Sequence, residues 1–137
     1  MFAGDVKGAT EIWTEGIRQN ELERPGNPYS QSSLGRLYAK LGRKEQARRH
    51  VRQLLAPEPH HPVYLFFASE SLALVGDRRE ALDTLKAAVE NGFFNLPMID
   101  GMARLPVGTF HSLRNDPEYP AIRADLARRV DELRARY

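Results

Sequence analysis

The sequence predicts an all-α fold of antiparallel helical hairpins packed one against the next. Apolar residues recur at spacings of three and four over several segments, which is the period of a helix with one buried face. Glycine and proline stand where such helices would end or begin. The same pattern returns after 34 residues, which indicates stacked units of one kind. With 137 residues, the chain is expected to form a single domain.

The first complete hairpin is expected to begin at Asn27 and Pro28, an N-cap residue followed by proline at the first helical position. Its first helix carries an apolar stripe of Leu34, Leu37, Tyr38 and Leu41, and Gly42 is expected to end it. The second helix has Ala47, Val51, Leu54 and Leu55 facing inward, and Pro57 and Pro59 follow its end.

A second hairpin of similar design is expected to open at Pro62. Its first stripe is Leu65, Ala68, Leu72 and Val75, closed by Gly76. Asp77 is expected to cap the following helix, whose inner face is Ala81, Leu82, Leu85, Ala88 and Val89. Gly92 is expected to end that helix.

A repeat emerges when the two hairpins are overlaid. Gly42 and Gly76 are 34 residues apart, and so are Ala47 and Ala81. Upstream, Gly4 and Ala9 keep the same offset from each other but lie 38 residues before their counterparts, which places a short insertion within residues 20–29. Units of this size cannot bury their apolar faces alone and therefore stack.

The run Leu34-Gly35-x-x-Tyr38, with the later Gly42, Ala47 and Pro59, resembles the tetratricopeptide repeat. The resemblance implies a short right-handed superhelix with a C-terminal capping helix. It divides the chain into a half repeat at 2–20, a repeat at 28–61, a degenerate repeat at 62–94 and a specialised segment at 95–137. An unrelated helical bundle with a coincidental 34-residue spacing remains the alternative fold.

The segment after residue 94 departs from the repeat, because Pro97, Gly101, Pro106 and Gly108 allow only short helices and loops. A last helix is expected after Asp116-Pro117, with a capping stripe of Ile122, Leu126, Val130 and Leu133. Residues 92–119 also resemble the closing segment of bacterial tetratricopeptide regions. That resemblance gives an alternative function, the regulatory C-terminal arm of a larger bacterial signalling protein such as a cyclase, a kinase or a winged-helix regulator.

The first helix has an apolar stripe of Val6, Ala9, Trp13 and Ile17 whose usual partner helix is missing from the sequence. Because exposed apolar stripes usually mark contacts, this one predicts either self-association through Trp13 or a place in a longer protein.

Catalysis, metal binding and nucleic-acid binding have little support. No catalytic or phosphate-binding motif is present, so we expect no enzyme activity and no cofactor, although residues that meet only in space could still form an active site. Adjacent His60 and His61 diverge and are expected to form a turn rather than a metal site. Lys44, Arg48 and Arg52 are expected to form a solvated helix face, because no interleaved aromatic residues suggest bound nucleic acid.

Bulk composition sets further limits. The 20 lysines and arginines nearly balance 18 aspartates and glutamates, giving a net charge of +2 that argues against a dedicated phosphate-binding surface. No apolar run approaches the about 20 residues that span a membrane. The chain has no cysteine and no signal-peptide pattern at its start, so a cytoplasmic location is expected.

The resemblance also implies a function, protein–protein interaction or scaffolding through the concave face of the first helices. By position, the partner-binding residues would be Tyr29, Ser32, Arg36, Lys40, Val63, Phe66 and Glu70. The family's carboxylate clamp is expected to be absent, since its positions hold Ser32, Arg36, Val63 and Phe67. Arg36→Glu and Phe66→Ala are predicted to weaken capture of a protein or peptide partner without unfolding the chain.

Overall fold

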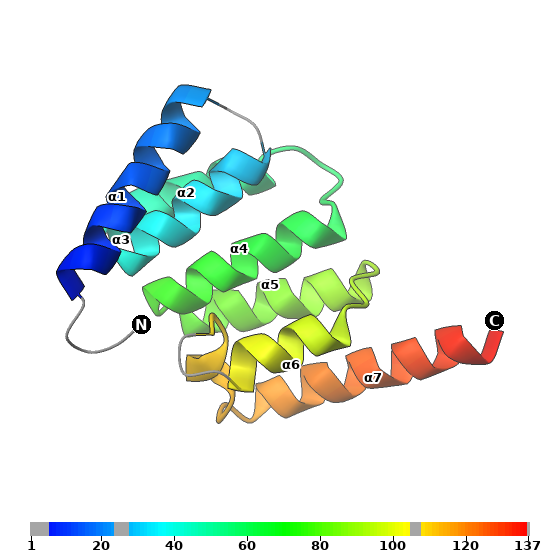
Figure 1. Cartoon of the computed structure of the whole chain (residues 1–137). Helices are drawn as coiled ribbons and strands as arrows, with labels where there is room; N and C mark the ends of the chain where they lie inside the picture. The colour runs from blue at the N-terminus through cyan, green and yellow to red at the C-terminus, as the bar shows by residue number, and fades with distance from the viewer. Residues whose placement is uncertain (1–5, 24–27, 105–107, 137) are drawn as a thin grey trace.

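The computed structural model describes residues 6–23, 28–104 and 108–136, and every regular element in these ranges is helical. The elements are α1 (Val6–Glu23), α2 (Pro28–Lys40), α3 (Lys44–Leu55), α4 (Pro62–Val75), α5 (Arg78–Glu90), α6 (Leu96–Arg104), the 3₁₀ helix η1 (His111–Leu113) and α7 (Glu118–Arg136). Helices α2 and α3 form one antiparallel hairpin and α4 and α5 the next (Figure 1). The all-α fold of packed hairpins is thus confirmed.

The hairpins build two layers. Helices α2 and α4 pack on each other in the front layer of Figure 1, and α3 and α5 lie behind them in an outer layer. Helix α1 packs on α2 at one end of the stack, while α7 packs along α5 at the other end. Each hairpin therefore covers the apolar face of its neighbour, as expected for repeats that cannot bury that face alone.

All three predicted helix stops adopt the left-handed backbone conformation, with φ of 75° at Gly42, 95° at Gly76 and 108° at Gly92. After each glycine the next backbone N–H returns to a carbonyl of the helix just ended; for Asp77 this bond to Leu72 is 3.0 Å. These are helix C-terminal caps that depend on glycine, because a side chain is strained at positive φ.

Gly76→Ala should therefore lower the free energy of unfolding by about 1 kcal/mol, measured by urea denaturation. The matched control is Gly101→Ala inside α6. A new Cβ would meet no atom within 4 Å at either site, but only Gly76 has a positive φ. Gly101→Ala should stabilise the chain by about 0.5–1 kcal/mol through helix propensity. Equal effects at the two sites would contradict the strain argument.

Small residues at Gly35 and Ala47 set the spacing of the first hairpin. Ala47 is fully buried, and a Cβ added at Gly35 would lie 2.9 Å from the hydroxyl oxygen of Ser71 on α4. Gly35 thus allows α2 to approach the next hairpin as well as its own partner helix. These small residues therefore permit close packing of the helices.

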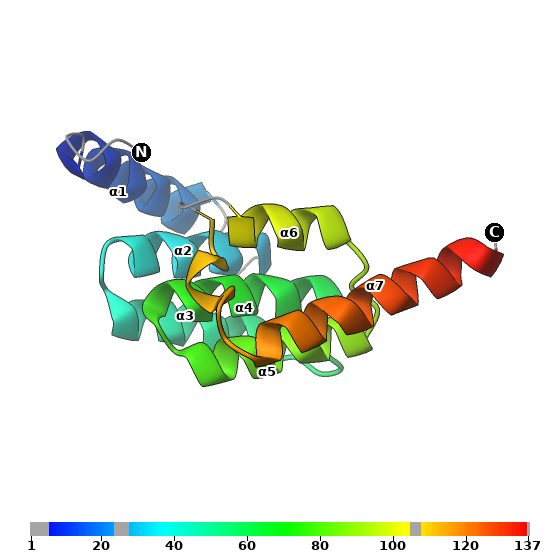
Figure 2. The same cartoon turned by 90° about the horizontal axis from the view of Figure 1, so that it is seen from below.

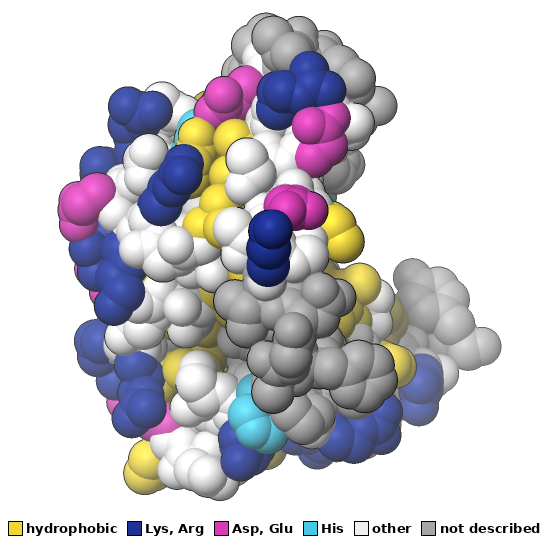
Figure 3. Space-filling view, turned by 60° about the vertical axis from the view of Figure 1, so that its left-hand side comes forward, with side chains coloured by type: hydrophobic (Ala, Val, Ile, Leu, Met, Phe, Trp, Pro, Cys, Tyr) yellow, Lys and Arg dark blue, Asp and Glu magenta, His cyan; other side chains and the backbone are white. Residues whose placement is uncertain are grey.

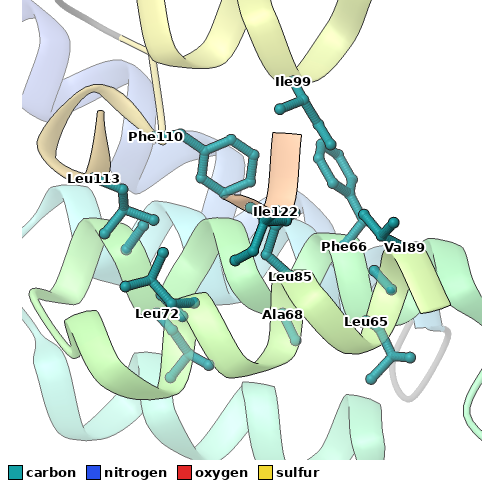
Figure 4. Close-up of a cluster of buried hydrophobic side chains, with 14 of the residues drawn as sticks. Leu65, Phe66, Ala68, Leu72, Leu85, Val89, Ile99, Phe110, Leu113 and Ile122 are labelled. Atoms are coloured by element: carbon teal, nitrogen blue, oxygen red, sulfur yellow. The ribbon is translucent and has the colours of Figure 1, made fainter. Parts of the chain in front are cut away.

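The apolar interior consists of two clusters of buried residues. The smaller joins α1, α2 and α3 through Ile17, Leu34, Tyr38 and Ala47, with Val75 of α4 also in contact. The larger extends from α3 to α7 and includes the residues of Figure 4. In that view Phe110 and Leu113, from the segment around η1, point into the space between α4 and the later helices (Figure 4). The C-terminal segment is therefore part of the core.

The apolar stripe of α1 packs against α2 and is not left exposed as expected, while self-association through Trp13 and a place in a longer protein stay predictions. Ala9 and Ile17 are buried, Trp13 is half-buried, and Ile17 packs with Leu34 and Tyr38 of α2. The Tyr38 hydroxyl also donates a hydrogen bond to Glu21 at 2.6 Å. The side chain of Val6 lies outside the described part of the structure. Among the described side chains of α1, Ile12 is an exposed large apolar residue and lies outside this stripe.

Asp77 does not cap α5 with its side chain as expected. Its carboxylate instead accepts two hydrogen bonds from Arg48 of α3, each 2.8 Å long. Arg48 was expected on a solvated face, yet this bidentate pair ties the outer helices of the two hairpins together. The planar fork of the guanidinium matches the two oxygens of the carboxylate.

Candidate protein-binding face

The residues predicted to bind a partner lie on α2 and α4, but the structure leaves only some of them accessible. Ser32, Phe66 and Glu70 are buried, Arg36 and Val63 are half-buried, and Lys40 is exposed. The side chain of Tyr29 lies outside the described residues. Three of the seven predicted residues are therefore inaccessible to a partner in this structure.

Phe66 is covered by the chain's own C-terminal segment. Its ring stacks on Phe93 with centroids 4.3 Å apart and planes 9° apart, and the ring of Phe110 meets it edge-on at 5.6 Å. Only 2% of Phe66 remains exposed. A partner cannot contact this ring while Phe93 and Phe110 cover it, so Phe66 is a core residue.

Glu70 is buried at the junction of α2, α4 and the η1 segment. The hydroxyl of Thr109 donates to its carboxylate at 3.0 Å, and a guanidinium nitrogen of Arg36 lies 3.7 Å away. Burial raises the pKa of Glu70, while Arg36 and the Thr109 hydrogen bond oppose that rise. Glu70 therefore connects Arg36 of α2 to the C-terminal segment rather than facing a partner.

The accessible part of the predicted binding face carries two cations, each of which lies next to an aromatic ring. The guanidinium of Arg36 lies 5.8 Å from the ring centroid of Phe67, and the ammonium of Lys40 lies 5.9 Å from that of Trp13. Arg36 and Lys40 are one helical turn apart on α2, so their charges repel. Partial desolvation, then Arg36, lower the pKa of Lys40. We call Trp13, Arg36, Phe67 and Lys40 the α1–α2 face.

This arrangement has chemical consequences. In the described part of the chain, the carboxylate paired with Arg36 is Glu70, which is already engaged by Thr109, and Lys40 has no ion pair. An added carboxylate or other anionic group would relieve the repulsion between the two cations. The aromatic rings beside them could cover an apolar part of the same ligand.

Sequence reasoning missed Trp13 as a neighbour of Lys40, because the two belong to different units of the repeat. The sequence did carry a signal for this contact. The 38-residue separation of Ala9 from Ala47 aligns α1 with α3, the second helix of a hairpin, and so places α1 against the following helix α2. The exposure of Lys44 and Arg52 on α3, by contrast, agrees with the solvated face expected from the sequence. Basic side chains line one edge of the molecule in Figure 3, and the exposed cations of α3 and α5 include Lys44, Arg49, Arg52, Arg78 and Lys86.

The histidines serve structural roles in the described ranges. His61 accepts a hydrogen bond from the backbone of Val63 at 3.1 Å and so caps α4, as expected for an inter-repeat turn. His60 bonds to the carbonyl of Leu55, and His50 stacks on Tyr38 in the interior. No three acidic or histidine side chains in these ranges are grouped as metal ligands would be. None of the helices described is long and apolar enough to span a bilayer.

Residues 28–53 match the family model of the tetratricopeptide repeat. These residues therefore form a tetratricopeptide repeat. The matched repeat covers α2 and nearly all of α3, the hairpin that carries the Leu34-Gly35-x-x-Tyr38 motif. No curated protein and no solved structure matches the chain. Tetratricopeptide repeats indicate protein–protein interaction or scaffolding, and the α1–α2 face is built partly by this repeat.

Proposed function

We propose that the chain is a protein-binding module with no catalytic activity of its own, and that it holds its partner on the α1–α2 face. The observation that carries the proposal is the pair of cations on α2, Arg36 and Lys40, set against two aromatic rings. The fitting ligand is an extended or helical protein segment with an acidic side chain beside an apolar one. We propose a protein partner rather than nucleic acid or lipid, and a cytoplasmic location.

The partner is expected to use less of the concave face than the family resemblance implied. The C-terminal segment covers Phe66 and Glu70, so the ligand would end near Arg36 instead of continuing along α4. Val63, at the start of α4, is half-buried and could contact only the edge of such a ligand. Residues Arg36 and Lys40 therefore replace the longer set of seven as the centre of the proposed site.

The proposal predicts that reversing both charges, in Arg36→Glu with Lys40→Glu, weakens partner binding at least about tenfold. Partners captured by the immobilised wild-type chain would be identified by mass spectrometry and then titrated as purified proteins. Arg49→Glu with Arg52→Glu on α3 is the matched control, since it makes the same charge change on the outer layer. Equal partner binding by the two double variants would overturn the proposed site. Binding that is lost only in the α3 variant would place the site on α3.

A narrower version makes the chain the regulatory C-terminal arm of a larger bacterial signalling protein. The resemblance of residues 92–119 to the closing segment of bacterial tetratricopeptide regions supports it. Sequencing the gene on both sides of this coding segment would test it, because a cyclase, kinase or winged-helix domain in the same reading frame is required.

A further inference from the structure

The two ends of the helical stack carry complementary exposed surfaces. At one end, Ile12 of α1 is 71% exposed, the largest value among the large apolar side chains of the described residues. At the other end, α7 continues past the body of the protein, and Leu133 on this projecting tail is 38% exposed (Figures 1 and 2). Exposed apolar side chains of this kind usually mark contact surfaces.

The surface around Ile12 is hollow and acidic. A shallow depression of about 620 Å³ is lined by Gly8, Glu11, Ile12, Glu15, Gly16 and Gln19. Ile12 lies within this lining, so an apolar side chain from another molecule could contact it there. Glu15 pairs with Arg18 in the same helix, whereas Glu11 pairs with no described residue. We call these residues the α1 hollow.

The tail of α7 is apolar along one stripe and basic on both sides of it. Residues 131–136 are all exposed, and Leu133 continues the stripe begun by Leu126 and Val130. At 3.6 residues per turn, Arg134 lies on one side of this stripe and Arg136 on the other. Neither forms an ion pair within the described part of the chain. An apolar stripe between arginines fits an acidic apolar surface.

We propose that copies of this chain associate head to tail, with the α7 tail of one copy seated in the α1 hollow of the next. Leu133 would enter the hollow beside Ile12, and Arg134 and Arg136 would face Glu11 and Glu15. Pairing of two α7 tails is disfavoured, because the flanking arginines would then face each other. The contact joins two different surfaces, so it builds open chains, or closed rings where the rotation between copies closes.

This contact is small beside a standard protein interface, so the association is expected to be weak and concentration-dependent. Sedimentation of the purified chain should show a mass that rises from the 15.6 kDa monomer as concentration increases from micromolar to millimolar. No partner protein is needed, so the result is independent of the function proposed for the α1–α2 face. A monomer at every concentration would overturn the proposal.

Charge exchange provides the specific test. Arg134→Glu with Arg136→Glu should abolish the rise in mass, and so should Glu11→Lys with Glu15→Lys. Mixing these two variants should restore it, since each then meets a surface of opposite charge. Arg49→Glu with Arg52→Glu on α3 is the control for net charge, and circular dichroism would verify helix content. Association that survives either reversal, or that the mixture fails to restore, would overturn the proposal.

The absence of native cysteine allows the contact to be mapped directly. Ile12→Cys and Leu133→Cys chains, mixed and mildly oxidised, should form a disulfide-linked heterodimer, because a disulfide requires Cα atoms within about 7 Å. Leu133→Cys alone should form much less dimer. Efficient dimerisation of Leu133→Cys by itself would indicate tail-to-tail pairing and overturn the head-to-tail arrangement.

Discussion

Phe66→Ala should lower the free energy of unfolding by about 3–5 kcal/mol, the usual cost of removing a buried phenylalanine ring. The ring is 2% exposed and fills the space between Phe93 and Phe110. Its removal leaves a cavity between α4 and the C-terminal segment, which small shifts cannot close because both sides are packed into one core. Equilibrium urea unfolding followed by circular dichroism would measure the loss.

Two control variants make this result specific. Ile12→Ala removes an exposed side chain and should change the free energy of unfolding by less than about 0.5 kcal/mol. Phe66→Leu keeps most of the buried volume and should fall between the two. If Phe66→Ala proved as stable as wild type but no longer bound a partner, the original placement of Phe66 on the binding face would be right and the packing described above wrong.

The elements of the fold could be predicted because their signals are local. Gly42, Gly76 and Gly92 end helices through backbone geometry that depends on a few neighbouring residues. Ala47 and Gly35 report close packing within a motif of fixed spacing. Such patterns act over one or two helical turns, so a single sequence is enough to locate them.

The candidate binding face could be predicted less well, because the exposure of its residues depends on distant parts of the chain. Thr109 reaches Glu70 across 39 positions of sequence, and no periodicity in α4 reveals that contact. One signal was available, however. Helix α4 is apolar nearly all round, from Leu65 and Phe66 to Ala73 and Val75, and such a helix is usually buried on every side. The prediction instead placed Phe66 and Glu70 on the binding face because the sequence resembles repeats with an open concave face.

Glu70→Gln should become progressively more stable relative to wild type as pH rises from 4.5 toward neutrality. Burial raises the pKa of Glu70 above its ordinary value of 4.5 in the folded chain. Below pH 4.5 the side chain is protonated in both the folded and unfolded states, so its stability contribution is fully present. Above that pH the unfolded state ionises first, and the wild type loses stability until the pH exceeds the folded pKa. Glutamine has no such transition.

The measurement is the difference in unfolding free energy between Glu70→Gln and wild type at several pH values, because groups common to both chains then cancel. Thr109→Val removes a hydrogen bond that holds the pKa of Glu70 down, so it should extend the pH range over which stability falls. Glu90→Gln, on the exposed side of α5, is the matched control for loss of one carboxylate. A difference for Glu70→Gln that stays constant with pH would mean that Arg36 and Thr109 fully compensate burial. In that case Arg36 and Glu70 would form an ordinary ion pair. Changing the pH would then not affect how stably the C-terminal segment packs on α4.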